Sequence, residues 1–137
     1  MSPLLAMRKA LFATLIQDTA LVTLLGDRKI YAVVPAATEP PYVSFGASRM
    51  MLWTGGSRMG HKHQIALDVW SRQSGDVEAL VVADRMTELL TPTVLKPDGL
   101  HVLHCYVEVL TCHLPQENGW RQVTLDLSVL TEMQASI

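Results

Sequence analysis

The chain has 137 residues and a net charge of −2, so it lacks the basic excess with which most nucleic-acid-binding domains meet phosphates. Its length fits one domain, residues 1–137. Apolar residues make up 49% of the chain and charged residues 18%, whereas soluble domains usually carry about 25% charged residues. This shortage of charge indicates either a domain that hides more surface than usual or an apolar surface patch that a partner covers, as in an obligate oligomer.

Two helices are predicted at the N-terminal end. Ser2 can accept a hydrogen bond at the start of a helix over residues 3–17. Asp18 can do the same for a short helix over residues 19–25, and Gly26 suits the left-handed position that ends it. The chain begins without the charged region of a signal peptide and has no apolar run of about 18 residues. We therefore expect a protein made in the cytoplasm, with reduced thiols and no membrane segment.

Three strands are predicted next. A short strand covers residues 30–34, and a second covers residues 42–52 after a loop with three prolines. Residues 53–58 should form a turn or a flexible hairpin tip, because they contain two adjacent glycines. A third strand over residues 60–70 alternates between apolar and polar residues. The residues on its apolar face are His63, Ile65, Leu67 and Val69.

The second half of the chain predicts a helix and a hairpin. The helix opens at residues 74–76, carries an apolar stripe as far as Leu90 and ends before Pro92. Residues 100–114 and 121–133 form two strands that should pair as an antiparallel hairpin. The predicted fold class is therefore α+β: a small, mostly antiparallel sheet of four to five strands packed by two main helices, in the order α-α-β-β-β-α-β-β.

The predicted hairpin tip is the leading candidate for a protein-interaction site. Trp and Arg dominate interface hot spots, and Met adapts to imperfect surfaces. The opposite interpretation, in which the tryptophan folds back onto the core and the methionines fill gaps, stays open at this point. The candidate interaction residues are Arg49, Met50, Met51, Trp53, Arg58, Met59 and His61.

Histidines and cysteines offer an alternative, a metal-binding enzyme or sensor. His61 and His63 share one face of a strand and could chelate a metal. Further possible ligands are His101, His104, Cys105, Cys112 and His113. On a regular strand, however, the first two of these point to opposite faces, and so do the two cysteines. The chain also lacks CxxC and HExxH motifs, a nucleophile elbow and a phosphate-binding loop, so we expect no metal, no cofactor and no enzymatic activity.

Four segments together resemble a known family. They are the D-x-x-L-x-x-L-x-G run over Asp18–Gly26, the P-P-Y-V run over Pro40–Val43, Trp53–Gly56, and the strand end Val69–Arg72 before a capped helix. Their order and spacing resemble the phage tail-completion proteins, also called tail terminators, of long non-contractile tails and phage-like gene transfer agents. The resemblance covers nearly the whole chain. The histidine- and cysteine-rich strand over residues 101–113 is not a recognised feature of that family.

The resemblance implies a structural role without catalytic residues. Such proteins form a ring, typically hexameric, at the head-proximal end of the tail tube. The ring halts polymerisation of the major tail tube protein and docks onto the head connector or stopper protein, and DNA can pass through it without sequence-specific contacts. The implied location is the tail of a virion or phage-like particle, assembled in the cytoplasm of the host bacterium. A protein-interaction adaptor outside a virion remains the other alternative.

Overall fold

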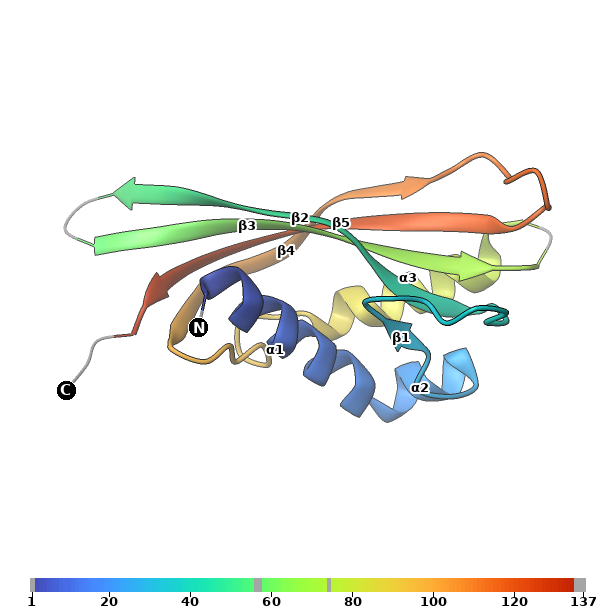
Figure 1. Ribbon diagram of the computed structural model, residues 1–137, viewed down its shortest axis with the longest axis horizontal. Coiled ribbons are helices and arrows are strands. Elements are labelled where there is room, and N and C mark those ends of the chain that lie inside the picture. Colours follow the sequence, from blue (N-terminus) through green and yellow to red (C-terminus); the bar gives the residue numbers. More distant parts are fainter. Residues whose placement is uncertain (1, 56–57, 74, 135–137) are drawn as a thin grey trace.

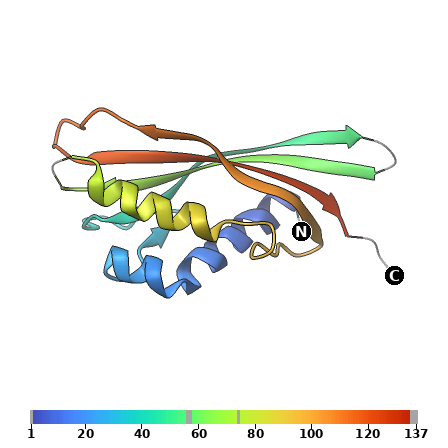
Figure 2. The same cartoon turned by 180° about the vertical axis from the view of Figure 1, so that it is seen from behind.

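The computed structural model describes residues 2–55, 58–73 and 75–134, and it confirms the α+β class and the predicted order of elements (Figure 1). All three helices lie on one side of a twisted five-stranded sheet, as the view from behind also shows (Figure 2). The elements are α1 (Pro3–Gln17), α2 (Thr19–Leu25), β1 (Ile30–Tyr31), β2 (Tyr42–Gly55), β3 (Arg58–Ser71), α3 (Val77–Leu89), β4 (Leu100–Cys112) and β5 (Arg121–Met133). Within the described residues, no helix is long and apolar enough to span a bilayer.

The strands follow the order β1-β2-β3-β5-β4 across the sheet. The pair β1–β2 is parallel, and the three other neighbouring pairs are antiparallel. Helix α3 connects β3 to β4, which is not the neighbour of β3 in the sheet. Strand β5 then lies between β3 and β4 and pairs with both. The predicted hairpin of the last two strands is thereby confirmed, while its insertion beside β3 was not predicted.

The core lies between the helices and one side of the sheet, which we call the helix side; the opposite side is the open side. On β3 and β5 the alternation predicted from the sequence holds, because every second residue is buried on the helix side. Helices α1 and α3 supply the opposing layer. The largest fully buried side chains include Met7, Leu11, Leu15, Ile65, Leu67, Met86, Leu125 and Leu127.

Several predicted boundaries are wrong around the first hairpin. Strand β1 has only two residues, because the chain leaves the sheet at the proline-bounded loop. Strands β2 and β3 run on as a regular ladder through Trp53 and Thr54, which were predicted to lie in the turn. Glycine permits a turn but does not force one, and the cross-strand ladder extends the pairing beyond it. Gly56 and Ser57, and also Ser74 at the predicted start of α3, lie outside the described residues.

Two bulges in β4 overturn the predicted directions of its side chains. The register shifts between Val102 and His104, and again between Val107 and Val109. Each bulge adds one residue to β4 opposite β5 and so reverses the alternation of faces. His101 and His104 therefore lie on the same, open side of the sheet. By the same argument Cys105 and Cys112 share the helix side. The alternation rule cannot reveal this, because bulges have no clear sequence signal here.

An aromatic cluster fixes the end of the sheet at which β2 begins. Tyr42 stacks on Trp70 with ring centroids 6.3 Å apart, and Tyr31 and Trp120 meet its ring edge-on. Trp70 also donates a hydrogen bond to Ser44 Oγ at 3.0 Å. These contacts join β1, β2, β3 and the residue before β5. They give the P-P-Y-V segment a packing role, since its tyrosine lies at the centre of the cluster.

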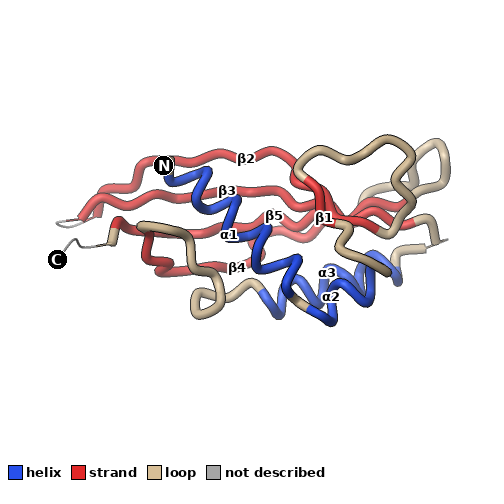
Figure 3. The backbone as a smooth tube through the Cα atoms, turned by 60° about the horizontal axis from the view of Figure 1, so that its bottom comes forward, coloured by secondary structure: helices blue, strands red, loops and turns tan. Residues whose placement is uncertain are grey.

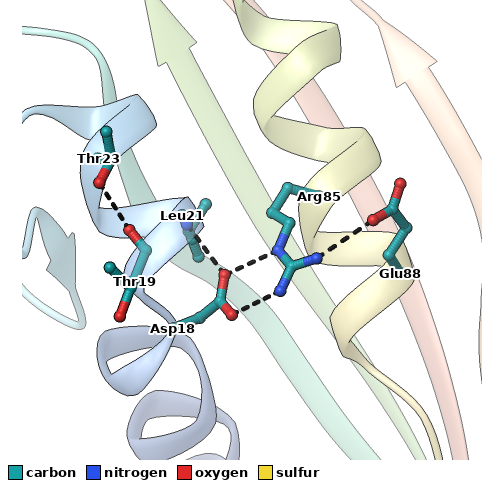
Figure 4. A network of polar contacts seen from close by, with 6 residues as sticks. All are labelled: Asp18, Thr19, Leu21, Thr23, Arg85 and Glu88. Carbon is teal, nitrogen blue, oxygen red and sulfur yellow. Dashed lines mark hydrogen bonds and ion pairs between the residues drawn. The ribbon is translucent and has the colours of Figure 1, made fainter.

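One ion pair connects the N-terminal helices to α3 (Figure 4). Asp18 caps α2 by accepting a hydrogen bond from the Leu21 amide at 2.9 Å, as predicted. Its two carboxylate oxygens also accept hydrogen bonds from Arg85 Nε and Nη2, at 2.8 and 2.7 Å. Hydrogen bonding to Arg85 is the main cause that lowers the pKa of Asp18. The pair is two-pronged and only partly exposed, which makes it stronger than an ordinary surface ion pair.

A histidine is enclosed in the core on the helix side. His63 is fully buried, and its Nε2 lies 3.1 Å from Thr131 Oγ1, while Nδ1 has no hydrogen-bond partner among the described residues. Burial lowers the pKa of His63 from 6.5 to about 4, and the neighbouring His61 adds to this shift. The imidazole is therefore neutral at pH 7 and acts as part of the core.

Replacement of Asp18 should destabilise the fold through its contact with α3. We expect Asp18→Asn, which keeps a capping oxygen but loses the charge, to lower the free energy of unfolding by about 1–3 kcal/mol. The measurement is urea denaturation at pH 7. Glu88→Gln is the matched control, because Glu88 also contacts Arg85 but its side chain is 69% exposed, so its loss should cost less than about 0.5 kcal/mol. Equal losses for the two variants would contradict the assignment.

Stability should also depend on pH, because the pKa of His63 differs between the folded and the unfolded chain. The unfolded chain binds a proton at this residue below about pH 6.5, whereas the folded chain resists it until about pH 4. The free energy of unfolding should therefore fall as the pH drops from about 6.5 to 4. This group contributes a slope of at most about 1.4 kcal/mol per pH unit. His63→Gln should flatten the curve in chemical denaturation, whereas His101→Gln, at an exposed position, should not. An unchanged slope in His63→Gln would argue against a buried neutral imidazole.

Candidate assembly surface

The paired ends of β2 and β3 project beyond the helices (Figures 1 and 3). We call this segment, residues 49–55 and 58–61, the arm. Its apolar side chains are exposed although they lie in regular strands: Leu52 is 62% exposed and Met59 57%. The other exposed apolar residues of the arm are Met50, Met51 and Trp53. A contiguous group of this kind is typical of a surface that another protein covers.

Trp53 is held in place on the open side of the sheet. It pairs across the strands with Gly60, and a Cβ atom built on that glycine would come within 2.5 Å of the indole ring and 2.7 Å of the Thr131 carbonyl oxygen. The indole thus lies against glycine backbone where no other side chain would fit. Trp53 is nevertheless 39% exposed, so it does not fold back into the core. A held, part-exposed indole has the properties of an interface anchor.

The other candidate residues are distributed over both sides of the arm. Register places Arg49 on the open side, where its Nε donates a hydrogen bond to Gln64 Oε1 at 2.6 Å. Met50 and His61 lie on the helix side, and His61 is half-buried. The backbone of Arg58 begins β3, while its side chain lies outside what the structure describes. Both sides of the arm are therefore available for contacts.

Leu52 belongs to this surface, although its residue type does not mark it as an interaction residue in the sequence. Its neighbours stand out because Met, Trp and Arg are enriched at interfaces, whereas leucine is not. The signal that could have found it is a run of four apolar residues, 50–53, in a strand that should alternate. Alternation fails there because neither side of the arm faces a core.

The possible metal ligands are divided between the two sides of the sheet. His61 and His63 lie on the helix side, whereas His101 and His104 lie on the open side. His113 also faces the open side, where its Nε2 lies 2.7 Å from Thr124 Oγ1. Among the described residues, no three His, Cys, Asp or Glu side chains gather closely enough to hold a metal ion. The ligand set considered from the sequence is thus not assembled.

The cysteines do not form a reactive site together. Cys105 is half-buried, its thiol lies 3.5 Å from the Leu90 carbonyl oxygen, and burial raises its pKa to about 11. Cys112 is exposed seven residues further along β4. Both thiols are free. A thiol with so high a pKa is a poor nucleophile, which favours a packing role for Cys105.

Comparisons with known proteins agree with the resemblance seen in the sequence. The profile of the family described as "Tail completion protein gp17" matches residues 9–132. No curated protein matches the chain significantly. A chain from the solved structure titled "Virion of native gene transfer agent (GTA) particle" has the same fold, with a TM-score of 0.84, 18% sequence identity, and coverage of 96% of this chain and 99% of that one.

The family match begins within α1 and ends one residue before the end of β5, so it covers nearly the whole sheet and most of its helical layer. At 18% identity the solved structure shows a shared fold alone. The two findings are independent, since one compares sequence patterns and the other compares shape. The chain belongs to the tail completion protein gp17 family, a family of structural proteins of the virion tail.

Proposed function

We propose that this protein is a tail terminator, which assembles as a hexameric ring at the head-proximal end of the tail tube. The ring stops polymerisation of the major tail tube protein and docks the tail onto the head connector or stopper protein. It acts by assembly and not by catalysis. The observation that carries the proposal is the family match over residues 9–132, and the solved relative from a gene transfer agent virion supports it.

The arm supports the same proposal on physical grounds. A protein that joins a ring to a tube and to a connector needs contact surfaces beyond its own core, and the arm provides exposed apolar residues on both sides. The chain's net charge of −2 suits passage of DNA through the ring without sequence-specific contacts. We place the protein in the tail of a virion or phage-like particle, assembled in the cytoplasm of the host bacterium.

Assembly of the purified protein is the first test. We expect sedimentation velocity over a range of concentrations to show a hexamer, because the exposed apolar surface is covered only in the oligomer. Electron microscopy of the same sample should show rings.

Deletion of the gene tests the role in the particle. The expected products are heads without tails, or particles with overlong tubes. A protein that stays monomeric and does not join purified tail tubes would overturn the proposal, and so would normal tails in the deletion strain.

Trp53 should matter more for assembly than for folding. We expect Trp53→Ala to weaken association or tube docking by roughly tenfold or more, as for a central hot-spot residue. The loss of unfolding free energy should stay below the roughly 3–5 kcal/mol of a fully buried Trp, since the indole is part-exposed. Val77→Ala, at an exposed site on α3, is the control. A sharp fall in melting temperature with unimpaired assembly of the folded fraction would make Trp53 a residue of stability only.

A further inference from the structure

Two long stretches of strand edge are unpaired in the described part of the chain. Strand β1 pairs only with Val43 and Ser44, so β2 has no partner on that edge from Ser48 to Gly55. Strand β4 is the last strand at the opposite edge, and all 13 of its residues lack an outer partner among the described elements. Unpaired edges expose backbone donors and acceptors that readily accept another strand.

The free edge of β2 lacks the features that keep edges of monomers apart. Monomeric proteins protect such edges with lysine, proline or bulges. Residues 48–55 contain neither Lys nor Pro, and the one bulge of β2 lies before them, between Phe45 and Ser48. Their one charged residue is Arg49, and four successive apolar residues follow it. These features are typical of a strand edge that another strand covers.

We propose that β4 of one copy pairs antiparallel with the free stretch of β2 in the next copy, so that the sheets form one continuous ring. This inference rests on the proposed ring and names the edges that join its subunits. Because β2–β3, β3–β5 and β5–β4 are all antiparallel, β4 runs opposite to β2. Copies rotated about an axis along the strands therefore place β4 against the next β2 in antiparallel order. Such a head-to-tail contact closes on itself and covers the free stretch of every β2.

The register predicts which residues meet. We call the position of a residue along the strand direction its height. Rotation about an axis parallel to the strands leaves the height of each residue unchanged. Met51 pairs with Lys62, Lys62 with Leu130, and Leu130 with His104, so Met51 and His104 lie at the same height on opposite edges. Both residues are exposed on the open side of the sheet. In the ring they should be direct neighbours across the subunit contact.

An apolar groove lies beside the same edge on the helix side. It has a volume of about 440 Å³ and lies between α1, the end of β1 and β2. Its apolar lining includes Leu5, Phe12 and Phe45. Phe45 pairs with Leu67, and the β5 partner of Leu67 pairs with Leu110 of β4. Phe45 and Leu110 therefore lie at the same height. Leu110 is 45% exposed on the helix side, so the next copy would direct it toward this groove.

Charge is also complementary between the two edges. Strand β4 contains one charged residue, Glu108, and no Lys or Arg. It stands in the bulge after Val107, whose height equals that of Ser48, next to Arg49. Arg8 and Lys9 add positive charge at the rim of the groove. Opposite charges about two residues apart along the strands favour the β4-to-β2 contact over a contact of two β2 edges, which would bring the cations together.

Cross-linking of introduced thiols tests the pairing. The variant carries Met51→Cys and His104→Cys in a background with both native cysteines changed to serine. Within one chain these positions are separated by two strands, about 14 Å, which is too far for a disulfide. Mild oxidation, or a bis-maleimide shorter than this span, should therefore link only different copies. We expect a ladder on denaturing gels that ends at the covalent hexamer.

The matched control moves one thiol along the same strand. Thr111 faces the open side of β4 at the height of Asp68, about 20 Å along the strands from Met51. Met51→Cys with Thr111→Cys should give no ladder. Wild-type light scattering is measured in parallel. Oligomers whose Met51/His104 thiols do not cross-link would overturn the edge pairing and leave the ring standing, whereas a protein that stays monomeric would overturn both.

An edge-blocking variant gives a second readout that does not depend on thiol geometry. We expect Leu52→Lys to weaken assembly by roughly tenfold or more, because an ammonium group on this edge repels an added strand. Val81→Lys, at a 44% exposed site on α3, should leave assembly unchanged. Circular dichroism checks that both variants fold. Undiminished assembly of folded Leu52→Lys would count against the proposal.

Discussion

The length of the sheet relative to its helices is the constraint on which the rest of this structure depends. Strands β2 and β3 have 14 residues each, about 46 Å, whereas the 15 residues of α1 span about 22 Å. Helix α1 covers only part of that length, and the end of the β2–β3 hairpin lies beyond the helices (Figure 1). The remaining part is the arm, where apolar residues are exposed on both sides. An antiparallel sheet tolerates water on a polar side, but this arm is not polar.

The covered part of the sheet makes the arm a defined surface. The ion pair between Asp18 and Arg85 holds the N-terminal helices to α3, and the inward residues of β3 and β5 fix the helices to the sheet. Because β2 and β3 continue without interruption from this core into the arm, its direction is set by the packing behind it. The contact of Trp53 with Gly60 extends that order almost to the end of the hairpin.

A ring would resolve the same constraint by symmetry. One copy leaves an unprotected edge on β2 and another on β4, and cyclic arrangement brings the two together without any further element. The two-residue β1 is consistent with this division, since it covers only the part of β2 near the aromatic cluster. The ring would also account for the low fraction of charged residues. A surface that a neighbouring copy covers in the assembly need not carry charge to keep the protein soluble.

Local chemistry allowed the sequence alone to predict the caps at Ser2 and Asp18, the left-handed Gly26, the alternation on β3 and β5, and the α+β class. Each of these depends on residues close together in the chain. The bulges of β4, the continuation of β2 past Trp53 and the place of β5 beside β3 depend on partners far away in sequence. The metal ligands show the difference most clearly. The sequence alone could place His61 and His63 on one strand face, but only the folded sheet could place His63 and His104 on opposite sides, because a strand's faces are fixed by its pairing.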